Sequence, residues 1–518
     1  MHRGAVARAL LAFLVVAAPV AAFAVSVPEP TPADYTGPPV ESLGERLGID
    51  ERTPAATTVD DEVEVIIELK QGAAVPRARL SVERVYTRRG ARRLHGRVAL
   101  DRVRELSQDP RIEAIRIERR GVGVDTSTAA GVEAVGADAL HARSVRGDNV
   151  TVGVIDRGFR PSDPEIAGHV GAYRSFDGDD EWVHGTAVAS VVADTAPNAT
   201  LHLASVGPTT TPEEYRRAVE WLEASGADVI VDAGSYFGQP GDGSGAVARI
   251  AATTAEETVF VAAAGNYGNR HWEGTDDGGH GEWVSFGSEQ GNALAAGEPM
   301  SGEVNLALRW DDSAADYDLY LMRIRPGDDE VVARSATRQT GDGAPVERVD
   351  ARVPRGRYYV AVQAHDASGS HELELFTNRR LSAPVANGSI TAPATARSVL
   401  AVGAYENGSV APFSSRGPVG EHTGVDLVAP DSVAATSVTD GEGTSYAAPY
   451  VAGTAALLVA RYPSLTPGQV RTILTASARD VGPAGPDVAA GNGLVDARTA
   501  YVLAGDRVRY SEVNRTST

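Results

Sequence analysis

Residues 150–156 read Val150-Thr151-Val152-Gly153-Val154-Ile155-Asp156. The apolar run before Asp156 predicts a strand that is buried on both faces of a sheet. Elsewhere in the chain, apolar runs predict further strands, and segments of helical spacing predict helices. The strands are expected at 201–206, 229–231, 259–262 and 399–402, and the helices at 183–193, 211–225, 445–461 and 466–478. This alternation predicts an α/β fold with a mostly parallel sheet, covered by helices on both faces.

Two regions depart from this alternation. Between residues 272 and 378 the helical spacing disappears, and alternating stretches are separated by Gly- and Asp-rich turns. This pattern predicts an inserted antiparallel β-sandwich. Residues 62–120 predict a separate α+β unit. Its strands are expected at 62–69, within 80–100 and at 112–117, and its helix at 101–107.

The charge of the chain limits its partners. Its 518 residues suit two or three domains. The formal net charge is −21, with 69 acidic and 48 basic residues. Such a surface repels nucleic acid and anionic membranes, so we expect neither as a partner. Only one basic residue, Lys70, is a lysine. This composition fits a salt-adapted, halophilic host, and a GC-rich genome that favours arginine is the alternative.

Residues 77–120 are basic, in contrast to the rest of the chain. They hold 14 arginines and six acidic residues, a net charge of +8, so the remainder carries −29 (−21 minus 8). This contrast favours docking of the small unit onto the acidic body. Cysteine is absent, which excludes disulfides and thiol catalysis.

The amino terminus has the pattern of an export signal. Arg3 and Arg8 precede an apolar run from Ala9 to Phe23, and small residues suit cleavage after Ala24. We therefore expect a secreted protein, extracellular or at the cell surface, with no membrane segment in its mature form. The alternative is an uncleaved anchor, which the short run and Pro19 disfavour.

Four polar residues lie where acyl-transfer chemistry needs them. Asp156 ends the first buried strand, while His184 and Ser445 each open a helix. His184 is expected to act as base for the Ser445 hydroxyl, with Asp156 orienting the imidazole and stabilising its cation. The Asn266 side-chain amide and the Ser445 backbone N–H would stabilise an oxyanion. Each residue alone has an ordinary explanation as a cap, a turn or a strand end, but their order on the expected elements is hard to obtain by chance.

The segments around these residues resemble the signatures of the subtilisin-like serine proteases, the subtilase or peptidase S8 family. They read Val-Ile-Asp156, His184-Gly-Thr, Ala-Gly-Asn266 and Gly-Thr-Ser445-x-Ala-Ala-Pro. The resemblance covers roughly residues 130–270 and 388–500. It implies a three-layer subtilisin-like fold and a serine endopeptidase that forms an acyl-enzyme on Ser445. Pro449 is expected in the first turn of its helix, where proline is tolerated.

The resemblance also implies a substrate pocket and partners. Gly234, Ser235, Ala263 and Ala264 would border the pocket. The partners would be protein or peptide substrates and the chain's own propeptide, and we expect a monomer. The chain departs from the family pattern at two places, and the second, in the cleft strand, leaves the substrate preference open. They are Arg157, where the family usually has Ser or Thr, and the unusual run 231–236.

Calcium is the one ion that the resemblance suggests. The chemistry itself needs no cofactor, and structural Ca²⁺ is expected from the family without assigned ligands. Four aspartates in the inserted region offer the oxygen ligands that Ca²⁺ prefers. They are Asp311, Asp312, Asp316 and Asp318. A solvated acidic loop is the alternative interpretation of this cluster.

Seven parts are therefore expected along the chain, which would be made as a self-processing zymogen cut between Arg119 and Thr128. They are a signal peptide at 1–24, a linker at 25–61, a propeptide-like α+β domain at 62–125, a first part of the catalytic domain at 126–271, the inserted β-sandwich at 272–384, a second catalytic part at 385–505 and a tail at 506–518.

Three other functions compete with this hypothesis. A binding protein on an inactive protease scaffold is suggested by Arg157 and the unusual cleft strand. A structural surface protein would rely on the β-sandwich instead. An esterase or lipase would need Gly-x-Ser-x-Gly around its serine, which Ser445 lacks. The intact set of four residues favours the peptidase.

Overall fold

Two units make up the chain, residues 1–123 and 124–518, and each is described by itself. The computed structural model describes residues 62–70, 73, 81–88, 91–99, 106, 109, 111–118, 128–176, 183–207, 210–326, 328–339, 341, 343–420, 423–435 and 438–516. The predicted signal peptide and linker, and the predicted helix 101–107 apart from Leu106, lie outside these residues. Among the described residues, no helix is both long and apolar enough to pass through a bilayer.

The first unit contains a four-stranded antiparallel sheet in the order β2-β3-β1-β4. Ile67 and Leu94, on the central strands β1 and β3, are completely buried. The predicted strands of this region are therefore confirmed. Their bounds are β1 (Glu62–Leu69), β2 (Ser81–Arg88), β3 (Ala91–Ala99) and β4 (Ile112–Glu118).

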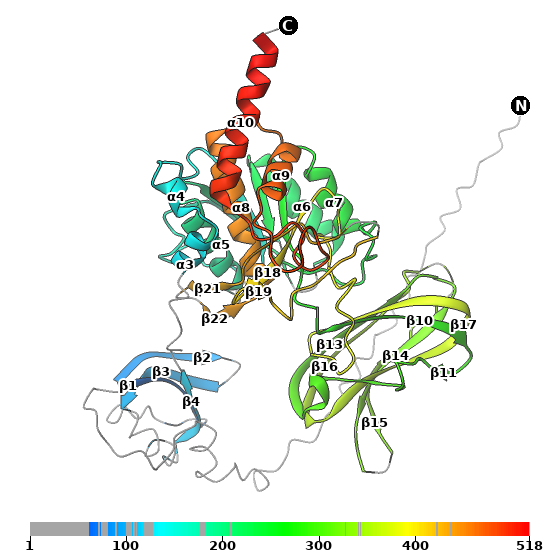
Figure 1. The fold of residues 1–518 in the computed structure, drawn as a ribbon. Coiled ribbons are helices and arrows are strands. Elements are labelled where there is room, and N and C mark those ends of the chain that lie inside the picture. The colour runs from blue at the N-terminus through cyan, green and yellow to red at the C-terminus, as the bar shows by residue number, and fades with distance from the viewer. Residues whose placement is uncertain are drawn as a thin grey trace, which may run out of the picture. The chain divides into compact units, whose positions relative to one another are not determined.

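A parallel sheet forms the centre of the second unit (Figure 1). Its order is β19-β18-β9-β8-β5-β7-β6, with β20 beside β18, and of these described strands only β19 runs antiparallel to its neighbour. The mostly parallel α/β sheet is thus confirmed. The strands are β5 (Thr151–Asp156), β6 (Val170–Ser175), β7 (Thr200–Ser205), β8 (Val229–Asp232), β9 (Val259–Ala263), β18 (Leu400–Glu406), β19 (Ser409–Val410) and β20 (Leu427–Pro430).

Alternation along the strands supplies a hydrophobic core on each face of this sheet. Val154 and Val231 point into the core that contains α5, α8 and α9, while Ile155 and Ile230 point into the core that contains α6 and α7. Hydrogen bonds between neighbouring strands satisfy the backbone N–H and C=O groups. The side chains on both faces of the sheet can therefore be apolar. The helices are α3 (Thr128–Ala134), α4 (Asp138–His141), α5 (His184–Thr195), α6 (Pro212–Ala224), α7 (Ala246–Thr254), α8 (Thr444–Arg461), α9 (Pro467–Ala476) and α10 (Ala497–Thr516).

Helix starts follow the expected capping chemistry. Thr211 caps α6: its hydroxyl accepts the Glu214 N–H, and the Glu214 carboxylate accepts the Thr211 N–H. Thr466 and Gln469 form the same capping box at α9. These reciprocal bonds satisfy N–H groups that a helix start leaves unpaired.

Antiparallel strands between His271 and Thr377 form a β module within the second unit. Most of them pair along one long strand, β17 (Tyr358–Thr377). Trp310 and Tyr317 are completely buried in its core. The other strands are β10 (His271–Gly279), β11 (Glu282–Trp283), β12 (Asn292–Ala293), β13 (Met300–Trp310), β14 (Asp316–Arg323), β15 (Glu330–Ser335) and β16 (Val346–Gly356). The sequence places its inserted β-sandwich here, and the limits 272–384 stay a prediction.

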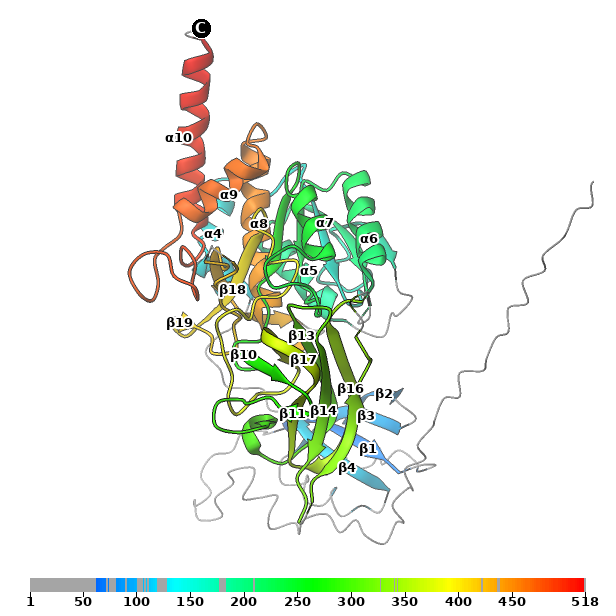
Figure 2. The ribbon, with the colours of Figure 1, turned by 90° about the vertical axis from the view of Figure 1, so that its right-hand side faces the viewer.

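One detail differs from the sequence-based expectations. Pro449 is not in the first turn of α8, because the helix begins at Thr444 and Pro449 is its sixth residue. Proline has no N–H, so the Ser445 carbonyl lacks its usual partner within the helix. Residues 506–516, within the predicted tail, belong to α10, which Figure 2 shows extending away from the parallel sheet, and the tail at 506–518 stays a prediction.

Candidate active site

Three elements bring Asp156, His184 and Ser445 to one place. Asp156 is the last residue of β5, His184 is the first of α5, and Ser445 is the second of α8. The α5 and α8 helices pack on the same face of the sheet. The predicted trio thus meets at the carboxyl edge of a parallel sheet, where the sites of open α/β folds form.

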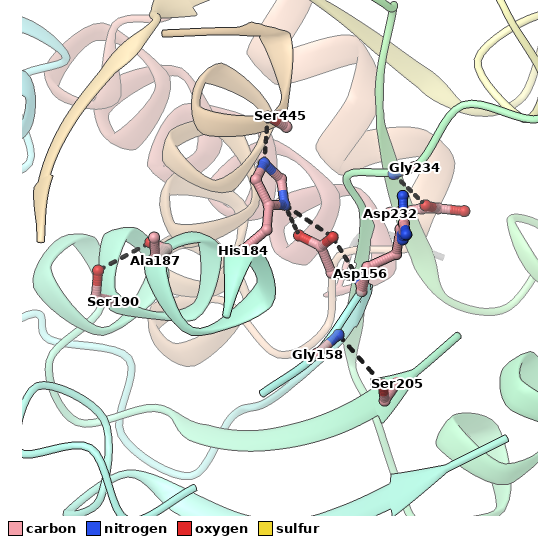
Figure 3. Close-up of polar contacts among 10 residues, drawn as sticks. Asp156, Gly158, His184, Ala187, Ser190, Ser205, Asp232, Gly234 and Ser445 are labelled. Atoms are coloured by element: carbon pink, nitrogen blue, oxygen red, sulfur yellow. Dashed lines mark hydrogen bonds and ion pairs between the residues drawn. The ribbon is translucent and has the colours of Figure 1, made fainter. Parts of the chain in front are cut away.

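A continuous chain of hydrogen bonds joins the three side chains (Figure 3). The His184 Nδ1 atom lies 2.9 Å and 2.8 Å from the two carboxylate oxygens of Asp156. The His184 Nε2 atom lies 3.0 Å from the Ser445 Oγ. With Nδ1–H donating to the carboxylate, Nε2 is left as an acceptor for the serine hydroxyl. The geometry is that of a nucleophile, a base and an orienting carboxylate.

Burial and charge set the basicity of His184. Asp156 and Ser445 are 3% and 7% exposed, and the His184 side chain is 32% exposed. Desolvation lowers the pKa of His184, but attraction and a hydrogen bond from Asp156 outweigh it, so the pKa is raised above 6.5. The Arg157 charge opposes Asp156 and lowers the same pKa. Because its pKa is raised, His184 takes up its proton at a higher pH than a free imidazole does.

Asn266 reaches the site from the segment that follows β9. Its Oδ1 accepts the Thr444 N–H at 2.9 Å and the Thr444 hydroxyl at 3.0 Å, which fixes the orientation of the amide. The Nδ2 therefore faces the other way. A Cβ placed on Gly443 would lie 2.9 Å from this Nδ2 and 3.3 Å from the Ser445 Oγ. The amide donor and the serine oxygen thus converge on one small space, as an oxyanion site needs.

The four residues expected at the pocket lie on two adjacent segments. Gly234 and Ser235 follow β8 and are half-buried, whereas Ala263 and Ala264 are buried at the end of β9. The Ser235 hydroxyl accepts a hydrogen bond from Thr391 at 3.0 Å, and the Thr391 N–H donates to the Ala264 carbonyl at 3.1 Å. Thr391 thereby connects the two segments beside Asn266. Their role in substrate binding stays a prediction.

Sequence reasoning missed a buried acid at this edge. Asp232, the last residue of β8, is 0% exposed and accepts hydrogen bonds from Gly234 and Tyr215. Burial raises the pKa of Asp232 to about 7, and repulsion from Asp156 acts in the same direction. The available signal was a single carboxylate that ends an otherwise apolar strand, two positions before Gly234, the first predicted pocket residue.

The candidate calcium ligands have different protein partners. Asp312 accepts the Ala314 N–H, Asp316 accepts the Gln339 N–H, and Asp318 accepts the Tyr320 hydroxyl. Asp311 lies 3.3 Å from the Nδ1 of His371. In the part of the chain that the structure describes, no three acidic, histidine or cysteine side chains come together as a metal site requires. Calcium binding stays a prediction without ligands.

Comparison with known proteins places this geometry in a family. The sequence model of the subtilase family, peptidase S8, matches residues 147–345 and 355–493. A thermostable alkaline protease from Halalkalibacterium halodurans is 37% identical over 143 residues, which are 26% of this chain and 39% of that protein. Subtilisin E from Bacillus subtilis is 28% identical over 183 residues, 32% of this chain and 47% of that protein. The chain thus spans less than half the length of these relatives.

The fold also has a counterpart among solved structures. The Clostridium perfringens CspB protease superposes with a TM-score of 0.54 at 19% identity, covering 72% of this chain and 99% of that one. Identity this low supports the fold alone. The family match, however, spans more than half of the chain and includes Asp156, His184 and Ser445. The chain belongs to the subtilase family.

Proposed function

We propose that the protein is a serine endopeptidase in which Ser445 is the nucleophile. One observation carries the proposal: the unbroken hydrogen-bond chain from Asp156 through His184 to the Ser445 Oγ. A serine hydroxyl is a weak nucleophile until a base takes its proton, and His184 has the position and basicity to do so.

The geometry supports a two-step reaction. Ser445 Oγ attacks the peptide carbonyl as its proton moves to His184 Nε2, and the oxyanion is stabilised by the Asn266 Nδ2 and the Ser445 N–H. The C–N bond then breaks, and His184 returns the proton to the leaving amine. Water attacks the resulting acyl-enzyme while His184 takes its proton. The ester bond breaks, the acid product leaves, and Ser445 regains its hydrogen.

A matched pair of serine variants tests the nucleophile. Ser445→Ala and Ser409→Ala each remove one hydroxyl, and Ser409 is exposed on β19. A fluorophosphonate probe is expected to label wild type and Ser409→Ala but not Ser445→Ala, and casein cleavage should follow the same pattern. Absence of labelling and cleavage in folded wild type at every salt concentration would favour a binding protein on an inactive scaffold.

We further propose a secreted zymogen. Three features support it: the signal-like residues 1–24, the basic sheet unit and the division of the chain at Gly123. The cleavage region expected between Arg119 and Thr128 lies almost wholly outside the described residues. Intact mass is expected to show a shortened wild type and a full-length Ser445→Ala chain. Identical maturation of both would assign processing to another protease.

The setting of the mature enzyme is proposed on the same grounds. Protein or peptide substrates and the chain's own propeptide are its partners, and it acts as a monomer outside the cell or on its surface. The acidic composition suits a salt-rich medium, where screening reduces repulsion among surface carboxylates.

A further inference from the structure

One buried carboxyl beside the triad has no part in the proposed mechanism. Asp232 ends β8 and pairs in register with Ile155, the residue before Asp156 on β5. Asp232 and Asp156 therefore both lie at the carboxyl edge of the sheet, and Figure 3 shows them near one another. Burying a carboxyl group costs folding free energy unless its oxygens accept hydrogen bonds. The donors to Asp232 therefore show which part of the chain it positions.

Each oxygen of this carboxyl has a donor. Oδ1 accepts the Gly234 N–H at 2.7 Å, and Oδ2 accepts the Tyr215 hydroxyl at 2.8 Å. The Tyr236 ring packs against Tyr215 with centroids 4.9 Å apart. A Cβ on Gly234 would lie 3.0 Å from both Asp232 Oδ1 and the Tyr236 hydroxyl oxygen, so these two atoms flank the glycine. The carboxyl thus fixes the backbone of the turn 233–235.

This turn lies between the two halves of the candidate active site. On one side, the Ala233 N–H donates to the Ile155 carbonyl at 3.2 Å, next to Asp156. On the other side, Ser235 is hydrogen-bonded to Thr391, whose N–H donates to the Ala264 carbonyl, two residues before Asn266. Residues 233–235 are half-buried, so part of the turn is open to solvent at this edge.

We propose that Asp232 is a positioning residue for peptide hydrolysis, whose carboxyl holds the turn 233–235 in the conformation that a bound peptide substrate needs. The inference rests on the proposed peptidase function and extends it to a residue outside the triad. Asp232 is completely buried and acts through the Gly234 N–H.

The surroundings of Asp232 make this effect depend on pH. The titratable groups that face it are Tyr215 from α6, Tyr236 after β8 and Asp156 from β5. Burial, aided by Asp156, raises its pKa to about 7, and the bonds from Gly234 and Tyr215 oppose that rise. The ionised carboxylate accepts the Gly234 N–H more strongly than the neutral acid does. KM is therefore expected to fall as pH rises through about 7.

The test compares two substitutions at Asp232, and one at Tyr215, with a matched control next to the same strand. Asp228, just before β8 at its opposite end, is exposed and accepts the Thr151 N–H, so Asp228→Asn is the control. Processed wild type, Asp232→Asn, Asp232→Ala, Tyr215→Phe and Asp228→Asn are titrated with a fluorophosphonate. Their kcat and KM for a chromogenic peptide are then measured from about pH 5.5 to about pH 9.

Asp232→Ala is expected to raise KM about tenfold at pH 8, as the loss of one hydrogen bond to a charged group would, with kcat within about threefold. Asp232→Asn should remove the inflection of KM near pH 7. Tyr215→Phe removes a bond that lowers the pKa of Asp232, so the inflection should move to higher pH. Asp228→Asn should behave as wild type.

The results distinguish a failure of the Asp232 role from a failure of the proposed peptidase function. A labelled, active wild type beside Asp232→Asn and Tyr215→Phe variants that keep its KM profile overturns the inference alone. This holds even where Asp232→Ala does not fold. A folded wild type that is neither labelled nor active contradicts the proposed function and this inference together.

Discussion

Arg157 follows the candidate triad aspartate directly, and two properties connect it to His184. Its backbone N–H donates to the Asp156 Oδ1 at 2.6 Å, and its positive charge lowers the pKa of His184. The first interaction belongs to the backbone and survives any substitution except proline. The second depends on the side-chain charge, so the two can be separated by mutation.

Removing this charge is expected to change the pH dependence of the enzyme. Catalysis needs neutral His184, so kcat/KM should fall as pH decreases through the raised pKa of that residue. Arg157→Ala removes a charge that lowers this pKa, so the acid limb should move to higher pH. Arg157→Lys keeps the charge and serves as the control. The acid limb of kcat/KM is measured on one peptide substrate for wild type, Arg157→Ala and Arg157→Lys. The same limb in all three proteins would show that the Arg157 charge does not affect the pKa of His184.

At the scale of elements, the start of α8 depends on Gly443. The space beside this glycine is shared by the Asn266 Nδ2 and the Ser445 Oγ. Gly443→Ala would place a methyl group there, so kcat is expected to fall at least about 100-fold, the lower end of the range known for losing such a donor in a subtilisin.

Gly468→Ala is the matched control for this substitution. Gly468 lies in the first turn of α9, and a Cβ placed on it meets nothing within 4 Å. Its variant should keep wild-type kcat and unfold at the same temperature or slightly higher, since alanine favours helix. A Gly443→Ala enzyme with wild-type kcat would show that the space is not used in the reaction.

Phe376 is one of the residues through which the β module packs on the segments beside the active site. Phe376 on β17 is buried, and its centroid lies 5.5 Å from that of Phe237, 5.6 Å from that of Tyr267 and 4.6 Å from that of His271. Tyr267 directly follows Asn266. The module therefore supports the segment that presents the oxyanion donor.

Phe376→Ala is expected to lower the free energy of unfolding by about 3–5 kcal/mol, through lost burial and an unfilled cavity. Denaturant unfolding in a Ser445→Ala background measures this without self-digestion. Val331→Ala, at a half-exposed position of β15, should change it by less than about 0.5 kcal/mol. Equal stability of the two variants would mean that Phe376 contributes no more than a surface residue.

The sequence predicted elements best where one residue pattern dominated. The apolar strand before Asp156 and the helix that starts next to Thr211 were predicted because an apolar run and helical spacing are local signals. The half-buried β6 (Val170–Ser175) and the mainly polar α10 were missed because neither has a clear apolar period. Their formation depends on contacts that only the folded chain supplies.

The candidate site shows the same division. Asp156, His184, Ser445 and Asn266 were placed from strand ends, helix starts and motif order. The role of Asp232 could not be predicted, because it depends on the register between β8 and β5 and on a tyrosine from α6. Strand register and contacts between distant elements are set by tertiary packing, so no single stretch of sequence predicts them.

At the scale of the whole molecule, net charge should govern stability in salt. The chain carries −21, and repulsion among its carboxylates opposes the compact state. The screening length falls from about 8 Å at 0.15 M salt to about 3 Å at 1 M. The unfolding temperature of the Ser445→Ala chain is therefore expected to rise with KCl over this range. A flat or falling temperature would contradict adaptation to a salt-rich medium.

The chain enters and leaves the β module at nearly the same point. The Thr377 N–H donates to the Arg270 carbonyl at 3.0 Å, and the Leu381 N–H donates to the Asn269 carbonyl at 2.9 Å. Because the two ends of the module lie next to each other, a linker of a few residues would suffice to join the chain after the module is removed. This junction is accordingly the natural splice point for excising the module, or for grafting a foreign one a few residues from Asn266.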